Sequence, residues 1–356
     1  MKKWMFVACI LLAGCTSTKE RPPQEEAVST DTEPVQSEEV IATQMQIPWN
    51  ITKASDRFII SQRGGSIVLI GPDDTKEETR LHLKQEIAHE GEGGLLGFVL
   101  DPDFSKNRLA YVYHTYNEES RIQNRIIQVR YEGDGWHEIK ELLSGIPGGS
   151  IHNGGRLAIG PDNKLYATAG DAGEARTAQE PEVLSGKILR MNLDGSIPED
   201  NPFSQSYVYT LGHRNPQGMA WDERGRMYAA EHGQRAHDEI NLIEPGRNYG
   251  WPIIEGDEQQ EGMEIPLFHS GEETWAPSGM DYQDGKLFVA ALRGEKLLVF
   301  DLEHQTEEVF YSGAGRLRDV YIDDNSLYVI TNNTDGRGNP SEEDDRLIRL
   351  PLSRSE

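Results

Sequence analysis

The chain has 356 residues and a formal net charge of -25, from 60 Asp and Glu residues against 35 Lys and Arg residues. A negative excess of this size disfavours binding to nucleic acid and to anionic lipid surfaces, because both need basic patches. It sets no limit on a small neutral ligand such as a sugar.

Residues 1–14 have the features of a bacterial export signal. A short basic start precedes the apolar run Trp4–Gly14, which is too short to remain as a membrane-spanning helix. The sequence Leu-Ala-Gly before Cys15 resembles a lipobox, in which the cysteine receives lipid and becomes the mature N-terminus. The alternative is an ordinary signal peptide with an incidental cysteine. We expect an exported lipoprotein, anchored on the extracytoplasmic face of the membrane through this lipid alone.

Residues 15–39 are mainly Ser, Thr, Pro, Gln and Glu. They bury too little apolar surface to offset the entropy cost of ordering, so we expect a disordered linker that carries the lipidated Cys15. The other cysteine, Cys9, lies inside the export signal, so no disulfide is expected. The remaining residues 40–356 contain no comparable linker and are predicted to form one domain.

A strand–turn–strand unit recurs in this domain. Each copy has a short apolar strand, a turn rich in Asp, Gly or Asn, and a second apolar strand. The copies lie at residues 49–60, 96–113, 156–168, 218–230, 279–290 and 319–330. The sequence shows no amphipathic helix longer than two turns, so we expect an all-β fold. Six strand-rich units predict a six-bladed β-propeller of four-stranded antiparallel blades. A sandwich and a β-helix are the alternatives.

The inner strands of a propeller bring distant loops to one mouth of a central channel. Short polar motifs stand near the predicted strand ends, and the densest run is 211–251. The motifs are Glu92-Gly93-Gly94, His152-Asn153-Gly154-Gly155, Gly170-Asp171, His213-Arg214-Asn215, Glu231-His232-Gly233, Leu292-Arg293-Gly294 and Arg316-Leu317-Arg318. Function tends to gather on loops that a rigid scaffold holds, so we expect a site at this mouth.

Three arginines and one histidine suggest the chemistry of that site. Arg293, Arg316 and Arg318 indicate a ligand with several carboxylates, because guanidinium groups bind carboxylates at two points. Arg316 and Arg318 are spaced to face the same side of a strand. The alternative is three surface arginines, each paired with a nearby aspartate.

His152 is the candidate general base, because a neutral imidazole accepts a hydroxyl proton near neutral pH and two glycines follow Asn153. Asp171 is positioned to orient its ring. His213, His232 and His237 remain alternatives on the residues alone.

Other cofactor classes leave little trace in the sequence. There is no His/Cys zinc motif, no nicotinamide-binding glycine motif and no Gly-x-Ser-x-Gly element. Calcium is compatible with Glu239 and nearby loop carbonyls, because it takes carboxylate and carbonyl oxygens together. The alternative for Glu239 is a solvent-facing carboxylate at a strand edge.

The motifs GHRNPQG, DEINLI and NYGWP, in this order within residues 212–252, closely resemble the soluble aldose sugar dehydrogenases that use pyrroloquinoline quinone. The similarity extends from Pro48 to Arg349 and includes GGLLG at 93–97 and GGRLAIGPD at 154–162. The resemblance implies a six-bladed propeller that binds this quinone and Ca²⁺ in its mouth and oxidises the anomeric hydroxyl of aldoses to lactones, with hydride transfer to the quinone. The electron acceptor that reoxidises the quinone is not identified by the sequence.

The resemblance also assigns roles to residues by matching positions. It implies that His152 is the general base, Asp171 its partner, and that Arg214 and Asn215 contact the reactive carbonyl region of the quinone. Arg293, Arg316 and Arg318 match residues that hold the cofactor carboxylates. Gly233 and Gln234 match carbonyl ligands of the catalytic calcium, and Glu239 and Tyr249 match a second calcium site.

Some positions depart from the family pattern. Glu92 replaces a glutamine beside the cofactor, which puts a negative charge near a polyanion unless an arginine pairs with it. Gln234 replaces a proline, and Arg293 replaces a lysine. Two other function classes remain as alternatives: a non-enzymatic propeller that binds a glycan or a protein, and a calcium-dependent propeller hydrolase of the lactonase type.

Overall fold

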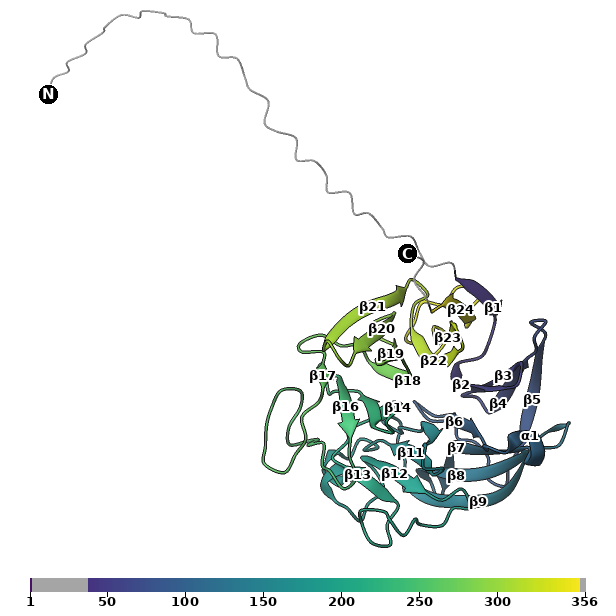
Figure 1. Cartoon of the computed structure of the whole chain (residues 1–356), viewed down its shortest axis with the longest axis horizontal. Coiled ribbons are helices and arrows are strands. Elements are labelled where there is room, and N and C mark those ends of the chain that lie inside the picture. The colour runs from purple at the N-terminus through teal and green to yellow at the C-terminus, as the bar shows by residue number, and fades with distance from the viewer. Residues whose placement is uncertain (2–37, 353–356) are drawn as a thin grey trace, which may run out of the picture. The chain divides into compact units, whose positions relative to one another are not determined.

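The computed structural model describes Met1 and residues 38–352 (Figure 1). The predicted export signal, Cys15 and nearly all of the predicted linker lie outside the described residues. The predicted domain start at residue 40 falls inside strand β1 (Glu39–Ala42). Within the described part of the chain, no helix is both long and apolar enough to span a bilayer.

The described residues form six four-stranded antiparallel blades, which confirms the predicted propeller. Blade 1 contains β2 (Pro48–Ala54), β3 (Arg57–Gln62), β4 (Ser66–Ile70) and β5 (Lys76–His82). Blade 2 contains β6 (Leu95–Leu100), β7 (Leu109–Glu118), β8 (Arg121–Tyr131) and β9 (Gly135–Pro147). Blade 3 contains β10 (Leu157–Ile159), β11 (Leu165–Ala169), β12 (Lys187–Met191) and β13 (Val208–Leu211).

The second half of the ring repeats this arrangement. Blade 4 contains β14 (Pro216–Trp221), β15 (Met227–Glu231), β16 (Glu239–Ile243) and β17 (Phe268–His269). Blade 5 contains β18 (Pro277–Gln283), β19 (Lys286–Ala291), β20 (Lys296–Asp301) and β21 (Thr306–Ser312). Blade 6 contains β22 (Leu317–Asp323), β23 (Ser326–Thr331) and β24 (Leu347–Pro351), and β1 completes it as the outermost strand. The two short helices are α1 (Phe104–Asn107) and η1 (Ala175–Gln179).

Two connections hold the ring of blades together. The first strand of each blade contacts the first strand of the next, from β2 through β6, β10, β14, β18 and β22 back to β2 (Figure 1). At the outer edge, β5 and β9 pair in parallel, so that blades 1 and 2 share one eight-stranded sheet. We call this β5–β9 pairing the seam.

The blades bury both of their faces, because each packs between two neighbours. Apolar clusters therefore lie between blades, for example Tyr111 of blade 2 with Leu165 and Leu189 of blade 3. All residues of β11 and of β12 are buried, including the polar Thr168, Lys187 and Arg190, so burial does not alternate along these strands.

A register shift interrupts the start of the inner strand in blades 1, 2, 4, 5 and 6. A β-bulge of this kind re-aims the side chains beside it. Trp49, Gln217 and Arg318 all lie at these shifts, and all three line the cavity at the channel mouth. Regular strand alternation therefore does not predict the directions of Arg316 and Arg318. Arg316 precedes β22, and Arg318 lies within the bulge of that strand.

A buried ionic network joins four of the inner strands near the channel. Asp319 of β22 accepts hydrogen bonds from the backbone N–H of Ile51 at 2.7 Å and from Asn50 Nδ2 at 3.0 Å. Its Oδ2 also lies 3.0 Å from Nη1 of Arg156, which precedes β10, and Asn50 Oδ1 accepts from the N–H of Phe98 in β6 at 2.8 Å. The Arg156 guanidinium sits 4.2 Å from the centre of the Trp49 ring.

We predict that Asp319→Ala lowers the free energy of unfolding by about 3–5 kcal/mol, because it leaves the buried Arg156 charge unpaired. Asp323→Ala is the matched control, since Asp323 ends the same strand and pairs with Lys53 in a partly exposed position. The control should cost no more than about 1 kcal/mol. Urea unfolding of both variants measures the difference, and equal losses would contradict a central role for the network.

Candidate functional site

The mouth of the channel holds a cavity lined from several blades. We call it the channel cavity and define it by six of its polar lining residues, Arg63, Glu92, Asn215, His232, Arg318 and Arg337. Three of these six side chains are guanidinium groups. The site therefore presents positive charge to a ligand although the whole chain carries a charge of -25.

A second cavity of opposite character shares His232 with the first. We call it the carboxylate cavity and define it by Arg214, Glu231, Gly233, Glu239, Tyr249 and Glu255. Because His232 lines both cavities, the cationic and the anionic spaces are neighbours at the same end of the propeller.

His152 and Asp171 come together as the sequence predicts. His152 Nδ1 lies 2.7 Å from Asp171 Oδ1, and the His152 side chain is 14% exposed while that of Asp171 is 2% exposed. His152 has φ 56°, in the left-handed region that is unusual for a residue other than glycine. Such conformations gather at functional sites. A Cβ at Gly170 would lie 2.0 Å from the His152 carbonyl oxygen, so the glycine is what lets the two loops approach.

Trp251 supports this pair from the next loop. Its indole Nε1 donates a hydrogen bond of 2.9 Å to Asp171 Oδ2, and its ring lies 5.4 Å from the Arg214 guanidinium. Burial alone would raise the pKa of Asp171, but the hydrogen bonds from His152, Gly173 and Trp251 outweigh it, and the pKa is lowered from the usual value. Asp171 is therefore an ionised acceptor that fixes the orientation of the His152 ring.

Glu92 has a different partner from the three predicted arginines. Its Oε1 lies 2.8 Å from Arg337 Nη1, and its Oε2 accepts a hydrogen bond of 2.9 Å from the backbone N–H of His152. Burial pushes its pKa up, yet these contacts prevail and the pKa is lowered. The extra negative charge is thus neutralised within the chain, and it holds the His152 backbone in place.

The three predicted arginines have different surroundings. Arg318 lines the channel cavity and donates to Asn332 Oδ1 at 2.8 Å and to Ser278 Oγ at 3.3 Å, both neutral groups. Burial lowers its pKa to about 9. Arg316 lies outside the lining and pairs with Asp335 at 3.0 Å, and Arg293 is exposed.

Three of the four predicted metal ligands line the carboxylate cavity. Gly233, Glu239 and Tyr249 belong to it, whereas Gln234 is exposed and outside the lining. Glu239 and Glu231 are register partners on β16 and β15. Burial and the nearby Glu231 raise the pKa of Glu239 to about 8. A space that opposes the ionisation of its own carboxylate fits a cation.

The competing histidines have structural partners. His213 is fully buried, with Nδ1 2.7 Å from Glu231 Oε2 and Nε2 2.9 Å from Thr210 Oγ1. His237 stacks near His269, with ring centres 6.3 Å apart. His232 is the exception, since its buried Nε2 has no partner among the described residues and the residue lines both cavities.

Sequence reasoning missed Arg63, Arg337 and the role of Trp251. Arg63 follows β3 directly, so the rule that polar residues at strand ends face the mouth would have found it. Arg337 lies in the long connection between β23 and β24, and no local pattern marks it.

Sugar dehydrogenases are among the known proteins that resemble this chain in sequence and in structure. A family model described as glucose/sorbosone dehydrogenase matches residues 45–349. Quinoprotein glucose dehydrogenase B of Acinetobacter calcoaceticus is 35% identical over 236 residues, which are 58% of this chain and 49% of that protein. The chain therefore spans about half the length of this relative.

Two other similar proteins match over nearly their whole length. Aldose sugar dehydrogenase YliI of Escherichia coli is 28% identical, covering 84% of this chain and 90% of that protein. The pyrroloquinoline quinone-bound aldose sugar dehydrogenase of Streptomyces coelicolor superposes with a TM-score of 0.82 and 38% identity, covering 88% of this chain and 98% of that one.

The lowered pKa of Asp171 predicts a pH-dependent contribution to stability. The ionised group is favoured by folding, so its contribution is present above the unfolded pKa of about 3.9 and is lost as the pH falls through the lower folded pKa. The difference in unfolding free energy between wild type and Asp171→Asn should be largest above pH 5 and should shrink toward pH 3. Urea unfolding at several pH values measures it, with the exposed Asp257→Asn as control. A pH-independent difference would be inconsistent with this prediction.

Proposed function

Because the chain belongs to the glucose/sorbosone dehydrogenase family, we propose that it oxidises the anomeric hydroxyl of aldose sugars to lactones, using pyrroloquinoline quinone and Ca²⁺. The observation that carries the proposal is the oriented His152–Asp171 pair at a mouth where a cationic and an anionic cavity adjoin. A proton acceptor, an anion-binding space and a cation-binding space are the parts that this chemistry needs.

The donor groups that line the channel cavity suit a planar, multiply carboxylated quinone. Arg63, Arg318 and Arg337 offer guanidinium donors, which suit carboxylates in two-point geometry. Arg318 has only neutral hydrogen-bond partners, and its buried charge is incompletely compensated. Gln217 Oε1 and His232 Nε2 also lack partners in the part of the chain that the structure describes. Buried polar atoms are normally paired, so these groups support a ligand in this space.

The carboxylate cavity fits Ca²⁺. Glu231, Glu239 and Glu255 supply oxygen donors, and Gly233 brings backbone into the same space. Calcium takes six to eight oxygen ligands of this kind. Its charge would favour the ionised form of Glu239 and so offset the burial and the repulsion by Glu231 that raise this pKa.

When bound, the quinone would accept the C1 hydride of the sugar and calcium would polarise the reacting carbonyl. The residues of the chain complete the chemistry. Asp171 accepts a hydrogen bond from His152 Nδ1–H in the neutral tautomer, which leaves Nε2 as the acceptor for the anomeric hydroxyl proton. Asp171 then stabilises the imidazolium that forms. Arg214, held over the Trp251 ring, supplies fixed positive charge where negative charge develops.

Reconstitution tests this function. The chelated and dialysed protein should reduce a redox dye only after addition of the quinone, Ca²⁺ and an aldose together. The measurement is dye reduction across a panel of aldoses, with each component omitted in turn. Undiminished dye reduction in the absence of the quinone or of Ca²⁺ would reject the proposal.

The same assay tests the role of His152. The variant His152→Asn should lose about 10²–10⁴-fold in turnover, the usual contribution of a general base, while its half-saturation by the quinone stays unchanged. His237→Gln is the matched control, because it replaces another histidine of the mouth loops. A fully active His152→Asn protein would remove this residue from the mechanism.

A further inference from the structure

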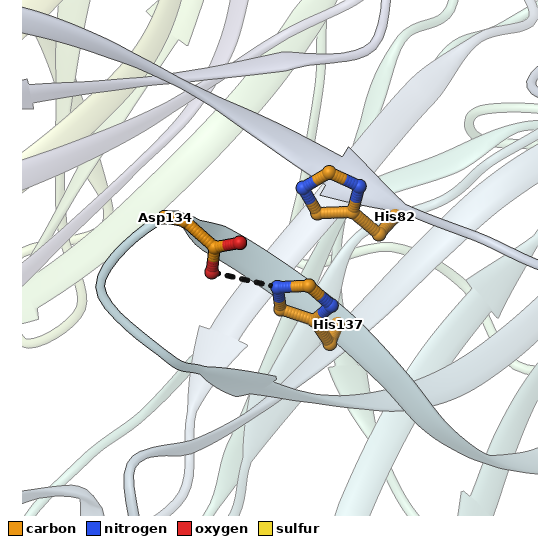
Figure 2. Close-up of side chains that lie close together, drawn as sticks. All are labelled: His82, Asp134 and His137. Atoms are coloured by element: carbon orange, nitrogen blue, oxygen red, sulfur yellow. Dashed lines mark hydrogen bonds and ion pairs between the residues drawn. The ribbon is translucent and has the colours of Figure 1, made fainter.

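Three side chains with metal-binding atoms gather at the seam, away from both cavities. His82 is the last residue of β5, His137 lies near the start of β9, and Asp134 stands in the turn before it (Figure 2). One ligand atom of each lies within 4.8 Å of the others. His137 Nε2 is 2.9 Å from Asp134 Oδ1, and the two imidazole rings stack with centres 4.3 Å apart.

We propose that His82, Asp134 and His137 form a binding site for a divalent transition-metal ion of the zinc class, which clamps blade 1 to blade 2. Two imidazole nitrogens and one carboxylate oxygen are a donor set that such ions prefer, with water completing the tetrahedron. Calcium and magnesium select oxygen donors instead, so this site differs in chemistry from the carboxylate cavity.

The present distances are compatible with closure around a metal. Bonds of about 2.0–2.2 Å to zinc place tetrahedral ligand atoms roughly 3.3–3.5 Å apart. The His137–Asp134 pair is already inside that limit, and the metal would take the place of the proton between them. His82 and Asp134 are exposed, so rotation of their side chains can bring all three ligand atoms from within 4.8 Å of one another to the spacing of a zinc site.

The backbone holds the two histidines beside each other. His82 and His137 are register partners in the parallel β5–β9 pairing, so both lie on the same face of the joined sheet. Gly135, with φ 150°, lets the two strands approach, because a Cβ there would lie 2.6 Å from the carbonyl oxygen of Arg80 and 3.2 Å from His82 Nε2. The cluster therefore depends on tertiary pairing of strands that lie far apart in the sequence.

A bound ion would strengthen the seam. Parallel pairing at β5–β9 spans three register pairs, and the blades on either side are otherwise separate sheets. An ion that binds the folded chain and not the unfolded one stabilises the fold by mass action, so the effect should appear in thermal unfolding.

Zinc titration of the untagged, full-length chain tests the proposal. Millimolar Ca²⁺ is present throughout, so that sites for oxygen-binding cations are filled. Wild type should bind one equivalent of Zn²⁺ and melt at a higher temperature with it, and Co²⁺ should give the visible absorption of a tetrahedral site. Loss of a residue that only orients a metal ligand typically lowers metal affinity by roughly 10–100-fold. His82→Gln and His137→Gln should each lower zinc affinity by more than this, because each removes a ligand.

The matched control is His304→Gln. His304 forms a similar exposed pair with Asp301, at 3.1 Å, but has no second histidine beside it. This variant should bind zinc as wild type does. Absence of zinc binding in wild type, or wild-type affinity in both His82→Gln and His137→Gln, would overturn the proposal.

Discussion

The buried guanidinium of Arg318 is the constraint around which the channel mouth is arranged. Two other arginines near the channel have carboxylate partners, Arg156 with Asp319 and Arg316 with Asp335. Arg318 is as deeply buried but donates only to a neutral amide and a hydroxyl, and burial lowers its pKa to about 9. Asp335 acts on Arg318 without forming an ion pair with it, so the buried charge is incompletely compensated, and its retention indicates a binding role for an anionic ligand.

The two cavities differ in the charge of the groups that line them. Positive charge lies where the ligand's carboxylates would bind, and the neighbouring carboxyl groups of Glu231 and Glu239 lie where a cation would bind. Between them, the ionised Asp171 orients His152, and Trp251 connects that pair to Arg214. The closed ring of inner strands makes this possible, because it brings loops from residues 63 to 337 to one rim.

The fold was predictable because the strand–turn–strand unit is local and repeats, as in β14 with β15 and β18 with β19. The closure of blade 6 by the four-residue strand β1 was not, because nothing in so short a segment specifies a partner some 300 residues away. Flanking glycines and strand ends pointed to His152 and Asp171. The bulge that turns Arg318 inward, the pairing of Glu92 with Arg337 and the seam histidines all depend on tertiary register, which sequence periodicity does not contain.

The most direct test of this account is a titration of pyrroloquinoline quinone into wild-type and Arg318→Gln protein, with urea unfolding of both apo forms. Loss of one charge-assisted contact of about 1.5–3 kcal/mol should weaken binding by roughly 10-fold or more. The apo variant should be as stable as wild type or more stable, because a desolvated charge has been removed. Unchanged quinone affinity, or a loss of stability that accounts for the loss of binding, would contradict the assignment of Arg318 to the ligand.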